Sequence, residues 1–140
     1  MSLRQAAHQF TVATRGQGLV EITAEIARWL AAQNPQTGLL TVYCRHTSAS
    51  LVIQENADPS VQRDLERVFA QLAPESASYE HDTEGPDDMP AHIKAALTQT
   101  SLSIPVTAGR MALGTWQGVY LFEHRRAPHR REMALHYIGV

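Results

Sequence analysis

Short apolar runs and alternating positions predict that most of this chain folds as β-strands. Residues 7–14 alternate loosely between apolar and polar, which is typical of a strand with one buried face. Gly16 and Gly18 predict a turn after this strand, and Ala108 with Gly109 predicts another turn further on. Further strands are predicted at residues 39–44, 50–53, 102–106, 111–113, 119–123 and 132–138.

Three segments show the three- to four-residue apolar spacing or the start signals of helices. Residues 24–33 carry an apolar face, and Thr23 is a candidate N-cap for this helix. Asp58 stands directly before a proline, which is a strong start signal for a second helix that ends at Pro74. Asp88, two residues before another proline, predicts a shorter third helix that ends near residue 97.

The order of these elements predicts the fold class. Strands precede and follow two to three helices without regular alternation, so we expect an α+β fold: a mainly antiparallel, sandwich-like sheet with flanking helices. A length of 140 residues fits a single domain spanning 1–140.

Composition excludes several classes of protein. The net charge of −2 argues against a general electrostatic grip on nucleic acid or on anionic membranes. A single cysteine, Cys44, rules out an intramolecular disulfide and a cysteine-based zinc knuckle. No apolar run approaches the ~20 residues that span a bilayer, and the first ten residues lack the pattern of a signal peptide. We therefore expect a cytoplasmic protein.

The densest candidate chemistry lies between residues 80 and 92, which hold two histidines and five acidic residues. Such a stretch indicates either a metal or acid/base site or a solvated acidic loop that leads into a helix. Asp88 precedes His92 by four residues, so the two could share one helical face. Asp88 could then either cap the helix or orient a histidine, and Asp87 is free of the capping role. His81 would come close to His92 only if the loop turns back at Gly85.

Other candidates lie elsewhere in the chain. His46, beside two hydroxyl residues at a strand end, could bind a metal, act as a base or bond locally. Residues 55–58 form a second polar group, and residues 114–118 form either a hairpin turn or a pocket wall. The arginine-rich tract 123–131 could bind an anion or form a solvated hairpin loop. It has no interleaved aromatic residues, so nucleic-acid binding is disfavoured, and the metalloprotease, Walker and serine-hydrolase motifs are absent.

Several motifs in one order resemble the YjbQ-like family, small proteins often described as secondary thiamine-phosphate synthase enzymes. The resemblance runs from about residue 10 to residue 140. It rests most on His46-Thr47-Ser48-Ala49-Ser50, on Glu55-Asn56-Ala57-Asp58-Pro59, on residues 85–94 (Gly-Pro-Asp-Asp-Met-Pro-Ala-His-Ile-Lys) and on residues 113–121 (Leu-Gly-Thr-Trp-Gln-Gly-Val-Tyr-Leu).

The resemblance implies a compact sandwich-like fold, a homotrimer and a polar pocket near the subunit interface. It implies that a divalent metal, zinc rather than magnesium, is held by His46, His81 and His92. Three imidazoles with an open position suit zinc, whereas magnesium prefers oxygen ligands. Candidate acid/base groups are Asp87, Glu55 and Asp88, and candidate substrate-binding residues are Asn56, Asp58, Thr115, Gln117, Arg125 and Arg130. Residues 126–129 depart from the glycine-rich loop of many relatives.

These residues lead us to expect a small metal-assisted enzyme acting on a phosphorylated small molecule. The thiamine-phosphate reaction joins a pyrimidine pyrophosphate to a thiazole phosphate and expels pyrophosphate, which calls for charge stabilisation on the leaving group. That activity is weak in the family and leaves the physiological role open. Two alternatives remain, a metal-dependent hydrolase and a non-catalytic trimeric module that binds a metal or an anion.

Overall fold

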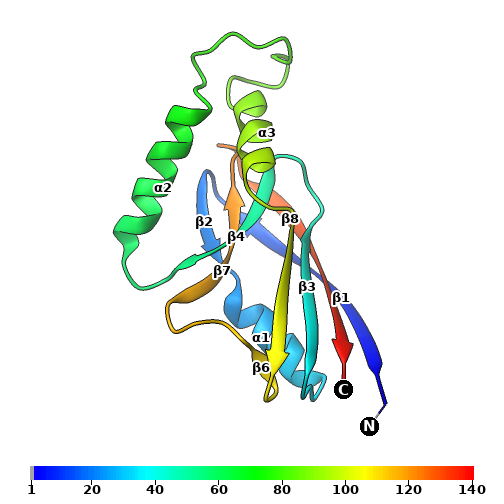
Figure 1. Ribbon diagram of the computed structural model, residues 1–140. Coiled ribbons are helices and arrows are strands. Elements are labelled where there is room, and N and C mark those ends of the chain that lie inside the picture. The colour runs from blue at the N-terminus through cyan, green and yellow to red at the C-terminus, as the bar shows by residue number, and fades with distance from the viewer. Residues whose placement is uncertain (1) are drawn as a thin grey trace.

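Two antiparallel sheets and three helices make up the computed structural model, which describes residues 2–140 (Figure 1). The elements follow in the order β1 (Arg4–Thr14), β2 (Gly18–Glu21), α1 (Thr23–Ala32), β3 (Gly38–Cys44), β4 (Ala49–Glu55), α2 (Pro59–Leu72), α3 (Asp88–Leu97), β5 (Ser101–Thr107), β6 (Arg110–Met111), β7 (Gln117–Glu123) and β8 (His129–Gly139). The α+β class predicted from the sequence is confirmed. No helix among the described residues is long and apolar enough to cross a membrane.

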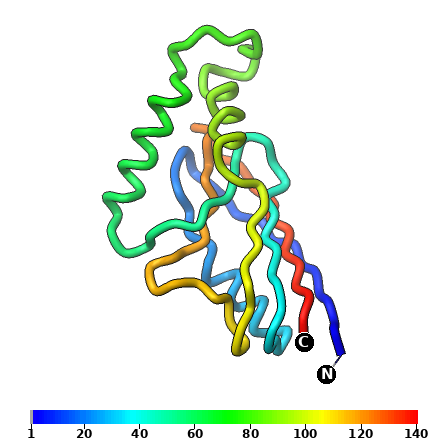
Figure 2. Tube along the Cα trace, in the orientation of Figure 1, coloured from blue at the N-terminus to red at the C-terminus, as the bar shows by residue number. Residues whose placement is uncertain are grey.

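The five-stranded sheet has the order β1-β8-β3-β5-β6, and the three-stranded sheet has the order β2-β7-β4. Every strand pair is antiparallel. The first and last strands pair along their full lengths, from Arg4 opposite Gly139 to Thr14 opposite His129. Figure 2 accordingly shows both chain termini at the same end of the larger sheet.

The core lies between the inner faces of the two sheets and α1. Leu40 and Val42 of β3 and Leu121 of β7 are fully buried, and α1 contributes Ile26 and Leu30 at its buried face. Burial of each such side chain contributes about 1.5–3 kcal/mol. By contrast, α2 has no fully buried residue, and it stands apart from α3 at one side of the molecule (Figure 1).

Two predicted helix caps are wrong, and one is confirmed. Asp58 caps α2 by accepting a hydrogen bond from the Ser60 N–H at 2.9 Å. Thr23, predicted as a cap, is the first residue of α1, because its hydroxyl accepts from the Val119 N–H at 2.8 Å instead. Asp88 likewise lies inside α3, and Asp87 occupies the capping position without a side-chain capping bond.

Strand β2 is the element that the glycine pattern obscured. Gly18 was predicted to be part of a turn, but residues 18–21 pair with β7 from Glu123 to Tyr120. Gly18 has φ +143°, and a Cβ there would meet the Glu66 carboxylate at 3.1 Å, so glycine is needed at this strand start. The strand predicted at residues 111–113 is shorter in the structure, where β6 comprises only Arg110 and Met111.

Candidate metal and anion site

Two histidines and one aspartate converge where α3 begins. His81 Nε2 lies 2.7 Å from Asp88 Oδ2, and His92 Nε2 lies 3.3 Å from the same oxygen. The ligand atoms of these three residues all lie within 4.8 Å of one another. The two rings meet edge to face, with centroids 5.5 Å apart. The structure therefore gathers two of the three predicted histidine ligands around a carboxylate.

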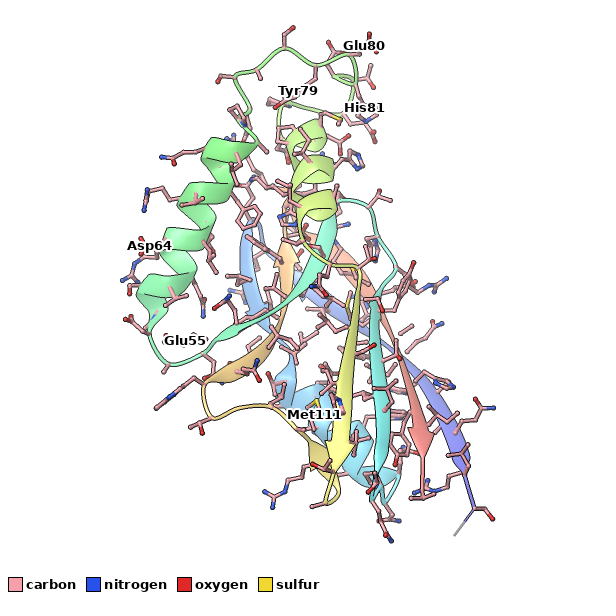
Figure 3. The ribbon with its side chains drawn as sticks, viewed as in Figure 1. Glu55, Asp64, Tyr79, Glu80, His81 and Met111 are labelled. Carbon is pink, nitrogen blue, oxygen red and sulfur yellow. The ribbon has the colours of Figure 1, made fainter. Side chains whose placement is uncertain are left out.

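Helix and loop geometry together build this cluster. Asp88 and His92 lie four residues apart in α3, so they share one face of the helix. His81 belongs to the long loop between α2 and α3, which arches over the start of α3 (Figure 3). Gly85 has φ +102°, a left-handed conformation that lets the loop turn back toward the helix.

The backbone of a distant strand end orients His92. Its Nδ1 lies 2.9 Å from the Thr47 carbonyl oxygen, which can only accept a hydrogen bond. Nδ1 must therefore carry a proton, and Nε2 of the neutral ring is left with a lone pair directed at Asp88. The pairing of His92 with a carbonyl matches the arrangement that fixes the tautomer of metal-binding histidines.

Arg125, at the end of β7, holds both aspartates in place. Its Nε donates to Asp87 Oδ2 at 3.0 Å, and Nη1 donates to Asp88 Oδ1 at 2.8 Å. Nη2 donates to the Glu84 carbonyl at 2.9 Å. Asp87 also accepts a bond from the Arg126 N–H at 2.9 Å. Arg125 was predicted to bind substrate, and in this structure it clamps the loop, the helix start and the carboxylates together.

These contacts keep both carboxyls ionised. Burial by itself would raise the pKa of Asp88, but the hydrogen bond from His81 and the positive charge of Arg125 outweigh it, so the pKa lies below 3.8. Burial also opposes ionisation of Asp87, and the bonds from the Arg126 N–H and Arg125 hold its pKa below 3.8. Asp88 is thus an anionic partner of the histidines rather than a helix cap.

His46 lies outside this cluster. Its Nε2 accepts a hydrogen bond from the Glu132 N–H at 2.7 Å, and Nδ1 lies 3.4 Å from Arg131 Nη1. Burial, together with the charge of Arg131, lowers its pKa. His46 and His92 nevertheless line one groove of about 260 Å³. On the other side, His81 lines a larger depression of about 370 Å³ together with Tyr79.

The second polar group predicted from the sequence forms its own cluster. Asp58 N–H donates to Glu55 Oε2 at 3.0 Å, and the Asn56 N–H donates to the Trp116 carbonyl at 2.9 Å. Gln117 accepts from a nearby backbone N–H at 2.8 Å. β4 separates this cluster from Thr47, and a strand of seven residues spans about 20 Å. Figure 3 shows Glu55 beside the start of α2, far from His81. Thr115 and Arg130 are exposed.

The arginine-rich tract contains a buried ion pair. Glu123 and Arg131 are 0% and 4% exposed and are bonded to each other, and Thr14 Oγ1 donates to Glu123 at 2.6 Å. Arg131 Nη2 also donates to the Ser48 hydroxyl at 3.1 Å. One of the two interpretations of this tract was a solvated hairpin loop. It does not fit the first and last residues of the tract, Glu123 and Arg131, because both are buried.

Two contributors to the site escaped sequence reasoning, the Thr47 carbonyl and the Glu84 backbone. Main-chain acceptors leave no side-chain signature, so only the position of Thr47 beside His46 pointed to this region. The donor set of two imidazoles and one carboxylate fits zinc, which such sites bind with an open coordination position. It fits magnesium poorly, because magnesium prefers oxygen ligands.

Comparisons with known proteins agree with these motifs. The family model "UPF0047 protein YjbQ-like" matches residues 8–140. A UPF0047 protein of Synechocystis is 52% identical over 139 residues, which cover 99% of this chain and 95% of that protein. The UPF0047 protein YjbQ of Salmonella typhimurium is 50% identical over 116 residues, covering 82% of this chain and 84% of that one.

Solved structures show the same fold. An uncharacterised protein of this family from Clostridium acetobutylicum superposes with a TM-score of 0.85 at 32% identity, covering 91% of this chain and 97% of that chain. A YbjQ-like protein of unknown function from Sulfolobus solfataricus reaches a TM-score of 0.91 at 20% identity, covering 99% of this chain and 100% of that one. At that identity the likeness concerns the fold alone.

Proposed function

The chain belongs to the YjbQ-like UPF0047 family, and from the geometry of its own residues we propose that it is a metal-dependent enzyme acting on a phosphorylated small molecule. His81, Asp88 and His92 would hold the divalent ion, with zinc preferred over magnesium. The substrate would lie in the depressions that flank these residues. Thiamine-phosphate synthesis is one candidate reaction.

One observation carries the proposal. Because the Thr47 carbonyl accepts a hydrogen bond from Nδ1–H of His92, the neutral ring presents a bare Nε2 to Asp88 Oδ2 at 3.3 Å. Two acceptors then face each other with no hydrogen between them, which is unfavourable. Either an extra proton or a metal ion relieves this contact, and a metal would also bond to His81, which lies 2.7 Å from the same oxygen.

The protein groups around the cluster suit positioning more than proton transfer. Asp87 and Glu55 were the candidate acid/base residues, but Asp87 accepts bonds from Arg125 and Arg126, and Glu55 accepts from the Asp58 N–H. When bound, zinc would supply positive charge toward a phosphoryl oxygen or lower the pKa of a bound water. Arg125 would keep Asp88 ionised and oriented for that ion.

Asp87 and Glu55 are both held by hydrogen bonds and are not free to transfer protons. This also favours a second candidate, a non-catalytic module that binds a metal or an anion. The two candidates share the metal site and differ in turnover. Among enzymes, metal-assisted hydrolysis requires only an activated water and a bound phosphoryl group. Transfer to a thiazole phosphate requires a second substrate beside the first.

Metal content tests the site. Wild-type protein and the Asp88→Asn, His81→Ala and His92→Ala variants would be dialysed against zinc and analysed by inductively coupled plasma mass spectrometry. We expect about one zinc per chain in the wild type and loss in the three variants. His8→Ala is the matched control, because this exposed histidine stacks on Trp29 of α1 and belongs to no proposed site.

The outcomes separate the possible ligand sets. Full zinc content in all three variants would refute the site. The His46→Ala variant decides the third predicted histidine: retained zinc agrees with its bond to the Glu132 N–H, whereas lost zinc would mean that His46 rearranges to join the ligands. Competition with excess magnesium should leave zinc bound.

Substrate assays then separate the functions. Zinc-loaded protein would be tested for pyrophosphate release from the two thiamine-phosphate precursors and for phosphate release from p-nitrophenyl phosphate. Turnover that is lost in Asp88→Asn and kept in His8→Ala supports the enzyme, and the product identifies transfer or hydrolysis. Zinc binding without turnover of either substrate favours the non-catalytic module.

We also propose that the chain forms a homotrimer through the outer face of the five-stranded sheet. Leu39 and Tyr43 of β3 and Ile138 of β8 are 40%, 45% and 39% exposed on this face, and Leu39 pairs directly with Ile138. Exposed apolar patches of this kind mark interaction surfaces. Sedimentation equilibrium should give three times the chain mass, and Tyr43→Glu should shift it toward the monomer. A wild-type monomer would refute the proposal.

A further inference from the structure

Lys94 is the only lysine in the chain, although lysine and arginine together number 12. Every other strongly basic side chain is therefore arginine. Lys94 lies on α3, and the residue as a whole is only 7% exposed. Lysine is almost never this buried unless it is paired with an anion.

No such pair exists among residues 2–140. No hydrogen bond or ion pair to the Lys94 ammonium forms among the described residues, and the carboxylate that acts on it most strongly, Glu75, is paired with Arg126 at 2.7 Å. The two other well-covered cations are fully paired, Arg125 with Asp87 and Asp88, and Arg131 with Glu123. A buried charge without a partner is costly, so this position calls for an anion that the chain itself does not supply.

The ammonium faces a cavity of about 180 Å³ between α2, the start of β2 and the end of β7. Phe69 and Phe122 form its apolar walls, with their rings edge to face at 5.4 Å. Two carboxylates also line it. Glu123 is already neutralised by Arg131, and Glu66 is exposed to solvent. Neither carboxylate forms an ion pair with the Lys94 ammonium.

This cavity is separate from the histidine cluster. Lys94 follows His92 by two residues, and successive helix residues are about 100° apart, so the two side chains leave α3 in nearly opposite directions. His92 faces the groove beside His46, whereas Lys94 faces α2. Changes at Lys94 can therefore be tested without touching a proposed metal ligand.

We propose that this cavity binds a small organic carboxylate, with its carboxylate on Lys94 and its apolar part against the wall formed by Phe69 and Phe122. A volume of 180 Å³ corresponds to about six water molecules, which fits a short-chain acid such as butyrate. Lysine acts as a single point charge, whereas phosphate is usually held by several donors or a bidentate arginine. With one cation and the Glu66 carboxylate nearby, a singly charged ligand suits the cavity better than phosphate.

Thermal unfolding and calorimetry with butyrate test the proposal. We expect butyrate to raise the unfolding temperature, and butyramide, its neutral isostere, to have no effect. Lys94→Met should weaken butyrate binding at least tenfold, since it removes a charge-assisted hydrogen bond. Glu66→Gln should tighten binding by removing a like charge. Lys94→Met should still fold, because methionine replaces an unpaired buried charge with an apolar chain.

The single lysine provides a second measurement in the unaltered protein. Cyanate carbamylates amines, and mass spectrometry of peptides reports Lys94 and the N-terminal amine separately. Butyrate should slow carbamylation of Lys94 by at least threefold and leave the N-terminus unchanged. Inorganic phosphate should give no such protection.

Three results would overturn the proposal: equal binding of butyrate and butyramide, equal butyrate binding by wild type and Lys94→Met, or no protection of Lys94 from cyanate. Protection by phosphate but not by butyrate would also overturn it, because the ligand class would be wrong. Zinc content, measured on the same Lys94→Met sample, should match the wild type.

Discussion

His124 should make the protein sensitive to mild acid. The ring is 1% exposed, and its Nδ1 is the buried side-chain atom without a hydrogen-bond partner among the described residues. Nε2 lies 2.8 Å from the Ser50 hydroxyl. Burial, with the nearby charge of Lys94, lowers the pKa of His124 from 6.5 to about 3. The folded protein therefore keeps this ring neutral where the unfolded chain protonates it.

The sign and size of the effect follow from this difference. Above pH 6.5 the ring is neutral in both states, and it does not affect stability. As the pH falls below 6.5, the His124 ring is protonated in the unfolded state but stays neutral in the folded state. The free energy of unfolding therefore decreases. One pKa unit is worth about 1.4 kcal/mol. The expected loss is about 2 kcal/mol at pH 5 and about 4 kcal/mol at pH 3, where the folded ring is itself about half protonated.

Urea unfolding of the wild type and of His124→Gln, at pH 7 and pH 5, isolates this contribution. Glutamine keeps an amide near Ser50 but does not titrate. The wild type should lose about 2 kcal/mol more than the variant between the two pH values. The other histidines are common to both proteins and cancel. Equal pH dependence in the two proteins would refute a buried neutral His124.

Three further outcomes follow from the packing and charges. Arg131→Met should cost about 3–5 kcal/mol in urea unfolding by leaving Glu123 buried and unpaired, and adding Glu123→Leu should recover most of the loss; no recovery would contradict the pairing. Gly38→Ala should cost about 1–3 kcal/mol, measured by thermal unfolding, because its Cβ would collide with the Ile138 carbonyl. Arg125→Gln should bind zinc more weakly, by at least about tenfold in competition titrations, since it releases the clamp that orients the ligand carboxylate; unchanged or tighter zinc binding would contradict this positioning role.

Hydrophobic patterning predicted the fold well because most strands have one buried face. Along β5, for example, Leu102, Ile104 and Val106 are buried between exposed neighbours. β2 was not predicted, because a four-residue strand that begins at a glycine has too short a pattern to distinguish from a turn. Its pairing with β7 is a tertiary contact that no local signal encodes.

The candidate site was predicted in composition but not in connectivity. Residues 80–92 stood out by their histidines and acids, and the four-residue spacing placed Asp88 and His92 on one face. Local signals made Asp88 a helix cap, yet Arg125, thirty-seven positions away, and His81 draw its carboxylate elsewhere. His46 could not be placed, because the backbone N–H that occupies its Nε2 comes from the distant strand β8.

The charges around the histidines determine the order in which a metal ion and a phosphorylated ligand can bind. Asp87, Asp88 and Glu84 carry three negative charges around the histidines, and Arg125 returns one positive charge. A phosphorylated molecule approaching this net negative cluster would be repelled. A divalent ion would bring the cluster to neutrality and present its own charge toward the ligand. Phosphate binding at this site should therefore depend on prior metal binding, whereas the Lys94 cavity already holds the positive charge that a carboxylate needs.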